Sequence, residues 1–116
     1  MRPLRCGDVY WLDHDDGRAI NPPYSHPHVV TAIHSSADNG AASVVVCTLT
    51  TNLAAAAEPG NIVLDKGEAG LLRQSVIVVS RRSTVSAERL RGFIGSLSED
   101  RVQQILSGSE FLERWF

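Results

Sequence analysis

The chain has 116 residues, enough for one domain with its own hydrophobic core and too few for two. A formal net charge of −2 excludes the broad basic surface typical of nucleic-acid-binding proteins. No apolar run reaches the roughly 18 residues of a membrane span, and Cys6 and Cys47 have no metal-binding spacing. We therefore expect a cytoplasmic protein, in a reducing compartment and without membrane contact, that folds as a single domain over residues 1–116.

Five short apolar segments have the composition of β-strands. They are rich in β-branched and aromatic residues and cover residues 8–12, 28–34, 43–51, 61–64 and 75–79. Glycine, proline and asparagine separate them, and Asn39-Gly40 is a strong hairpin signal. Short strands joined mainly by turns predict a strongly bent antiparallel sheet or a small barrel.

The last third of the chain predicts helix. Ser98 can cap the longest helix, which has two acidic residues in its first turn and an expected end at Gly108. Residues 86–90 predict a short capped turn, and residues 111–116 predict a separate amphipathic turn. The fold class predicted is therefore mainly β with a C-terminal helix (α+β).

Two histidines precede and begin the second strand. His26 and His28 are two residues apart, so they would share one face of an extended strand. Imidazole titrates near neutral pH and serves as an acid, a base or a metal ligand. His34 would lie ~20 Å beyond His28 at the rise of a strand, so a third ligand is lacking and we expect no metal site. An acid–base role for one histidine and a purely structural role for both remain open.

Two further groups of polar residues follow strands. Thr50 and Asn52 share a face at the end of the third strand and could hydrogen-bond a phosphate or a base edge. Thr48 and Thr51 are explained by the strand preference of threonine. Arg81 follows the fifth strand, where its planar guanidinium suits phosphate, although a solvated strand end explains it equally well.

The chain also carries an ordered set of short motifs from end to end. They are Gly7-Asp8, His26-Pro27, Leu49-Thr50-Thr51-Asn52, Pro59-Gly60-Asn61, Gln74-Ser75-Val76 and Ile94-Gly95-Ser96-Leu97. In this order the motifs resemble those of the MazF/PemK toxin family. The resemblance implies an SH3-like small barrel of about five to seven strands with a C-terminal helix, usually assembled as a homodimer.

The resemblance also implies an activity. Family members are toxins of type II toxin–antitoxin systems, are held in check by a small cognate antitoxin protein, and cleave single-stranded RNA (mRNA) at short sequence motifs. The 2′-hydroxyl attacks the adjacent phosphate without a metal or other cofactor. Such chemistry requires a base, an acid and donors for the charged phosphorane.

The family's catalytic pair is the arginine of an Arg-Pro step and the threonine after the Val-rich strand. Thr50 matches the threonine, whereas His26 stands in place of the arginine. We therefore expect His26 and Thr50 to be catalytic. Arg18 and Arg81 are candidates for the missing cation, and we expect both to bind substrate together with two further residues, His28 and Asn52.

The replaced arginine leaves two alternatives open. A non-catalytic or weakly catalytic module on the same fold could bind a protein target, as gyrase inhibitors do, because a fold alone does not determine function. The other alternative is a metalloprotein whose ligands are histidines.

Overall fold

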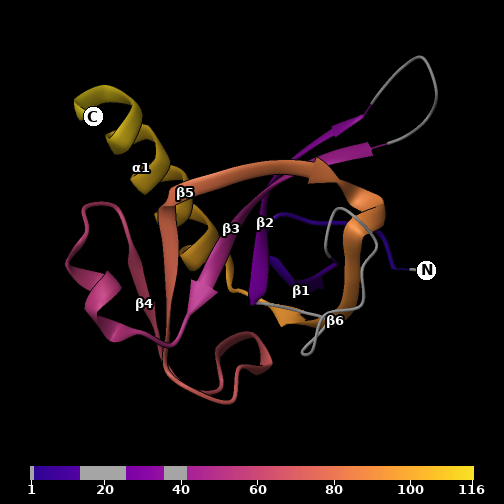
Figure 1. Cartoon of the computed structure of the whole chain (residues 1–116), viewed down its shortest axis with the longest axis horizontal. Coiled ribbons are helices and arrows are strands. Elements are labelled where there is room, and N and C mark those ends of the chain that lie inside the picture. Colours follow the sequence, from indigo (N-terminus) through magenta and orange to yellow (C-terminus); the bar gives the residue numbers. More distant parts are fainter. Residues whose placement is uncertain (1, 14–25, 36–41) are drawn as a thin grey trace.

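The computed structural model describes residues 2–13, 26–35 and 42–116, which form six strands, one α-helix and three short 3₁₀ helices (Figure 1). The strands are β1 (Asp8–Leu12), β2 (Pro27–Ser35), β3 (Ala42–Thr50), β4 (Ile62–Leu64), β5 (Ser75–Ser86) and β6 (Leu90–Ser96). The helices are η1 (Leu53–Ala57), η2 (Glu68–Gly70), η3 (Ala87–Arg89) and α1 (Glu99–Trp115). The predicted mainly β fold with a C-terminal helix is confirmed.

The six strands form one sheet in the order β4-β5-β3-β2-β1-β6, with every neighbouring pair antiparallel. The sheet bends strongly, and β5 crosses one side of it before the chain turns into β6 (Figure 1). β2 and β3 pair as the hairpin signal requires, although Asn39-Gly40 itself lies outside the described residues. β3 lies between β2 and β5, so residues that are far apart in the chain are neighbours along its length.

Strands at the centre of the sheet are buried on both faces, as their Val-rich sequences predict. One core cluster contains Val29, Leu49 and Ile77, together with Ile105 from α1. The second, on the other side, contains Val30, Val44, Val46 and Val85. β2 and β3 therefore carry core side chains on both of their faces.

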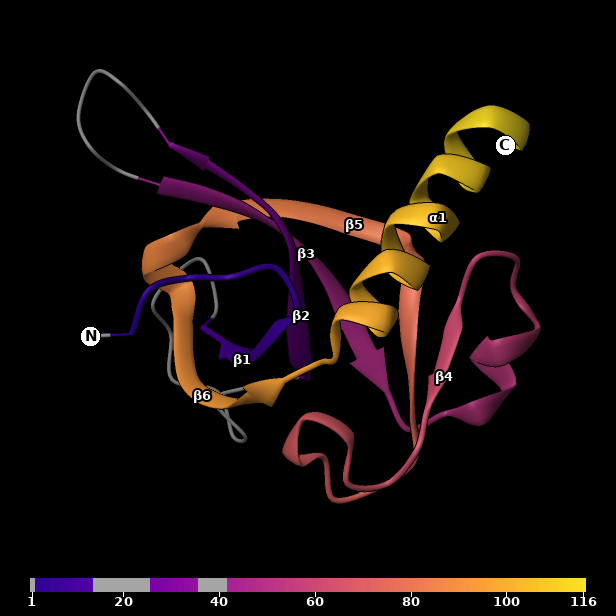
Figure 2. The ribbon, with the colours of Figure 1, turned by 180° about the vertical axis from the view of Figure 1, so that it is seen from behind.

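Helix α1 lies across the sheet and is longer than predicted (Figure 2). Ser98 caps it as expected, its Oγ accepting a hydrogen bond from the Arg101 amide at 3.3 Å. Gly108 does not end the helix, which continues to Trp115. A Cβ at Gly108 would lie 2.8 Å from the carbonyl oxygen of Gly60, so this glycine permits close packing of α1 on the turn before β4.

The sequence prediction also missed β6 and the second half of β5. Residues 90–96 are largely half-buried or exposed and lack apolar alternation, so their strand structure comes from pairing with β1, where Tyr10 faces Phe93. A side chain at Gly95 would collide with the backbone of Ala69. The predicted capped turn near Ser86 is confirmed as η3. None of the described helices is both long and apolar enough to span a membrane.

Candidate active site

A cavity of about 450 Å³ with a mainly polar lining opens beside the end of β3. Its lining includes His26, Thr50, Asn52 and Arg81, four of the six residues predicted to form the site. They come from the segment before β2, from the end of β3, from the start of η1 and from β5. The fold therefore brings together residues that are separated by up to 55 positions in the sequence.

Thr50 and Asn52 form a small hydrogen-bonded unit at the end of β3. The Asn52 amide donates to Thr50 Oγ1 at 3.1 Å, and Asn52 Oδ1 caps η1 by accepting from the Ala54 amide at 3.2 Å. The hydroxyl of Thr50 thereby receives one hydrogen bond and keeps its own hydrogen to donate. The Nδ2 group of Asn52 is a second available donor, so the unit offers two donors to an anion in the cavity.

Arg81 reaches the cavity because β5 leaves its ladder with β3 there. The pairs Cys47↔Arg82 and Leu49↔Ile77 show that β5 advances five residues while β3 advances two. Such bulges redirect side chains and are common beside active sites. Arg81 is exposed, and the described part of the chain gives its guanidinium no ion-pair or hydrogen-bond partner. Its neighbour Arg82 is instead paired with Glu113 at 3.0 Å.

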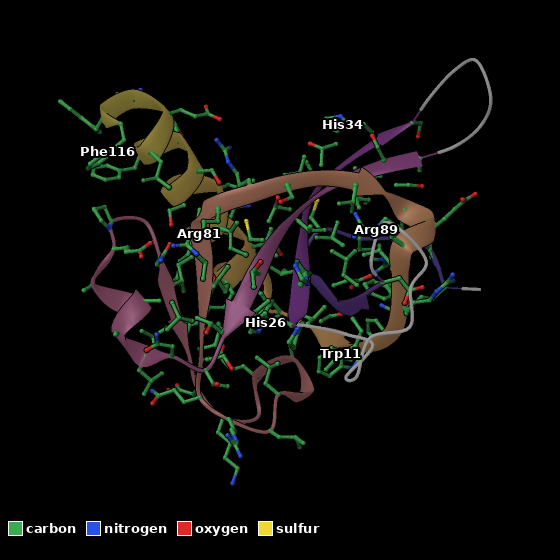
Figure 3. The ribbon with its side chains drawn as sticks, in the orientation of Figure 1. Trp11, His26, His34, Arg81, Arg89 and Phe116 are labelled. Atoms are coloured by element: carbon green, nitrogen blue, oxygen red, sulfur yellow. The ribbon has the colours of Figure 1, made fainter. Side chains whose placement is uncertain are left out.

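His26 is exposed and lies just before β2, where it lines two adjoining cavities. Figure 3 shows His26 and Arg81 flanking the final part of β3. The second cavity has a volume of about 520 Å³ and a mainly apolar lining that includes Trp11, Leu71 and Ile94. An imidazole at the boundary of a polar and an apolar cavity can reach a phosphodiester in one while the attached nucleoside occupies the other.

His28 does not line the cavity with these four residues. It is buried, with 8% of its surface exposed, and packs where β2 pairs with β3. His26 and His28 were expected to share a strand face, but β2 begins only at Pro27, so His26 is not part of the strand. Burial lowers the pKa of His28 below the ordinary histidine value. The hydrogen bond to the His26 backbone opposes this shift, and the nearby charges of His26 and Arg89 add smaller lowering effects. Arg18, the remaining predicted residue, lies outside the described residues.

Two polar residues of the cavity lining were not predicted as site residues, Thr48 and Glu58. Thr48 Oγ1 is 3.2 Å from Nε2 of His28. Glu58 is the one acidic side chain among the described lining residues, and its Oε2 accepts a hydrogen bond from Ser80 Oγ at 3.0 Å. The sequence around Glu58, which follows a run of alanines, does not indicate a site residue. Its contact with Ser80 arises only in the folded chain.

Metal ligation has no geometric support in the described part of the chain, where no three His, Cys, Asp or Glu side chains are grouped suitably for an ion. The site instead offers donors (Thr50, Asn52, Arg81), an imidazole and a carboxylate. This is the inventory needed to bind a phosphodiester and to move protons around it.

Comparison with known protein families assigns the chain to one of them. Residues 5–109 match the family described as PemK-like, MazF-like toxin of type II toxin-antitoxin system. The chain therefore belongs to this toxin family, as its ordered motifs indicated.

Curated relatives include Endoribonuclease MazF2 of Mycobacterium bovis and Endoribonuclease MazF6 of Mycobacterium tuberculosis. Each is 28% identical over 103 residues, covering 87% of this chain and 89% of the relative. The alignment thus spans most of both proteins.

Solved structures share the fold. An endoribonuclease in complex with its cognate antitoxin, from a mycobacterial species, superposes with a TM-score of 0.70 at 17% identity, covering 99% of this chain and 98% of that one. The Mycobacterium tuberculosis toxin MazF-mt6 superposes with a TM-score of 0.69 at 15% identity, covering 92% and 96%.

Proposed function

We propose that this protein is a metal-independent endoribonuclease toxin that cleaves single-stranded RNA (mRNA) at specific sequences. The observation that carries the proposal is the single cavity that collects His26, Thr50, Asn52 and Arg81. The endoribonuclease names of relatives at 28% identity support RNA cleavage, and they favour a nuclease over a module that binds a protein target.

The proposed reaction is attack of a ribose 2′-hydroxyl on the adjacent phosphorus. The P–O2′ bond forms, the P–O5′ bond breaks, and the products carry a 2′,3′-cyclic phosphate and a 5′-hydroxyl. Arg81 and the Thr50 hydroxyl stabilise the charge that develops on the non-bridging oxygens, with Asn52 as a further donor. His26 either takes the proton from the attacking 2′-hydroxyl or gives one to the departing O5′.

We also infer that the protein works as a cytoplasmic homodimer that a cognate antitoxin inhibits. Apolar side chains remain exposed along α1 and at the residue after it, including Leu106, Phe111, Trp115 and Phe116. The rings of Phe111 and Phe116 pack with centroids 5.9 Å apart. Apolar surface of this kind favours a protein partner. Light scattering should give twice the chain mass, and Trp115→Glu should shift the species to monomer if α1 contributes to the dimer.

The activity is tested by incubating purified protein with a long unstructured RNA in EDTA. We expect fragments with cyclic phosphate ends and a strong loss of cleavage in His26→Ala. His34→Ala, which changes an exposed histidine in β2 that does not line the cavity, should cleave as the wild type does. Intact RNA at high enzyme concentration, with His26→Ala indistinguishable from the wild type, would overturn the proposal.

A further inference from the structure

The proposed reaction requires two proton carriers, and the four predicted cavity residues supply one. The 2′-hydroxyl must lose a proton as it attacks, and the departing O5′ must gain one. The guanidinium of Arg81 stays protonated in proteins, and hydroxyl and carboxamide groups are poor bases at neutral pH. His26 can serve one of the two oxygens, so a second group must serve the other.

Glu58 is the one acidic side chain among the described residues that line this cavity. From this position we propose that Glu58 is the general base of the reaction. The inference rests on the proposed RNA cleavage and extends it to a residue outside the predicted catalytic pair.

The backbone of Glu58 is fixed at the end of η1. Its amide donates to the Ala55 carbonyl at 3.2 Å and closes the 3₁₀ helix. The side chain of Asn61 donates to the same carbonyl at 3.0 Å and accepts from the Ser80 amide at 3.2 Å. These bonds tie η1 to β5, so the carboxylate projects from a rigid point of the fold.

The carboxylate itself is anchored through one oxygen. Oε2 accepts from Ser80 Oγ at 3.0 Å and from Asn61 Nδ2 at 3.4 Å. Oε1 has no hydrogen-bond or ion-pair partner among the described residues, and no ion pair joins Glu58 to Arg81. One oxygen therefore orients the group while the other remains free to accept a proton, which is the arrangement a positioned base requires.

A negative charge in this cavity opposes RNA binding, because phosphates bring charge of the same sign. A residue that only braced η1 against β5 would not need that charge, since a glutamine could accept the Ser80 hydrogen bond equally well. Proton transfer is a role for which the carboxylate is needed.

In the resulting step, Oε1 of Glu58 takes the 2′-hydroxyl proton while the O2′ lone pair forms the bond to phosphorus. The P–O5′ bonding electrons leave with O5′, which receives a proton from the imidazolium of His26. Glu58 ends protonated and His26 neutral, and exchange of one proton with water restores both. Atoms and charge balance without another reactant.

Single-turnover cleavage of an RNA oligonucleotide by Glu58→Gln is the test, with Glu88→Gln as the control for loss of an exposed carboxylate remote from the cavity. We expect Glu58→Gln to slow cleavage by about 10²–10⁴-fold and to remove the acidic limb of the pH–rate profile. Binding of the uncleavable 2′-deoxy oligonucleotide should be unchanged or tighter. Glu88→Gln should match the wild type in both.

Glu58→Ala with added formate covers the case in which glutamine disturbs the fold. Recovery of part of the rate with rising formate supports a missing base, which a brace alone would not produce. Wild-type cleavage with an equally active Glu58→Gln would overturn the role of Glu58 and leave the proposed function intact. A wild-type protein that binds RNA without cleaving it would overturn both.

Discussion

Nε2 of His28 and Oγ1 of Thr48 lie 3.2 Å apart across the pairing of β2 with β3. On the other side of the ring, Nδ1 lies 2.8 Å from the carbonyl oxygen of His26. A carbonyl only accepts, so Nδ1 carries the hydrogen and the neutral ring receives the Thr48 hydroxyl at Nε2. His28 thus orients a hydroxyl at the cavity wall and fixes the backbone of His26, although it does not line the cavity.

The buried His28 predicts a stability that depends on pH. Its folded pKa is lowered, chiefly by burial, so the unfolded chain binds a proton more readily than the folded one. The contribution to stability is complete above the ordinary imidazole pKa of about 6.5, and it is lost as the pH falls from there through the lower folded pKa. Urea unfolding of the wild type between about pH 5 and 8 should show this decline.

His28→Gln keeps a donor and an acceptor at this position but does not titrate, so its stability should vary less over the same range. His34→Gln changes an exposed histidine in the same strand and should retain the wild-type slope. If the free energy of unfolding varied equally with pH in the wild type and in His28→Gln, His28 would not be the source of the pH dependence.

Gly108 predicts an unusual response to alanine. Alanine normally stabilises a helix interior over glycine by about 1 kcal/mol. Here the added Cβ would lie 2.8 Å from the Gly60 carbonyl oxygen, and overpacking of that kind costs about 1–3 kcal/mol. We expect Gly108→Ala to lower the free energy of unfolding, whereas Ser107→Ala, at an exposed site on the same helix, should leave it unchanged or slightly higher. A stabilised Gly108→Ala would refute the close packing.

The two cysteines should react differently with a thiol reagent. Cys47 is fully buried, and burial raises the pKa of its thiol to about 11. Cys6 is exposed. Titration with a chromogenic disulfide at mildly alkaline pH should count one thiol per folded chain and two after unfolding in guanidinium. Fast reaction of both thiols in the folded protein would contradict the burial of Cys47 in β3.

Arg81 and Arg82 form a matched pair for testing the phosphate contact. Arg81 lines the cavity without a partner among the described residues, whereas Arg82 pairs with Glu113 on α1. Arg81→Gln should reduce RNA cleavage by about 10²-fold or more, and Arg82→Gln should lower it little. The same order should hold for binding of a 2′-deoxy oligonucleotide at low salt. Similar losses in both variants would indicate only a general charge effect.

The sequence predicted those features that depend on local pattern. Buried strands such as β3 follow from β-branched runs, and the start of α1 follows from Ser98 as its cap. Thr50 and Asn52 were placed together because they are two residues apart at the end of a strand. Their common cavity with Arg81 could be expected only from the family resemblance.

Features that depend on tertiary contacts escaped prediction. β6 has few buried apolar residues and becomes a strand through pairing with β1. Gly108 looked like a helix end, but it is the contact point of α1 with Gly60. Glu58 reaches the cavity because Ser80, 22 residues away, holds its carboxylate. None of these relationships has a periodic signature in the chain.

The most direct test of the polar cavity as the cleavage site is the single-turnover rate of Thr50→Val beside that of Thr51→Val. The two residues are adjacent, but Thr50 lines the polar cavity and Thr51 the apolar one. We predict that Thr50→Val slows RNA cleavage by about 10²–10³-fold, the usual effect of removing a donor to the transition state, while Thr51→Val stays within a few-fold of the wild type. Equal rates for Thr50→Val and the wild type would contradict the account.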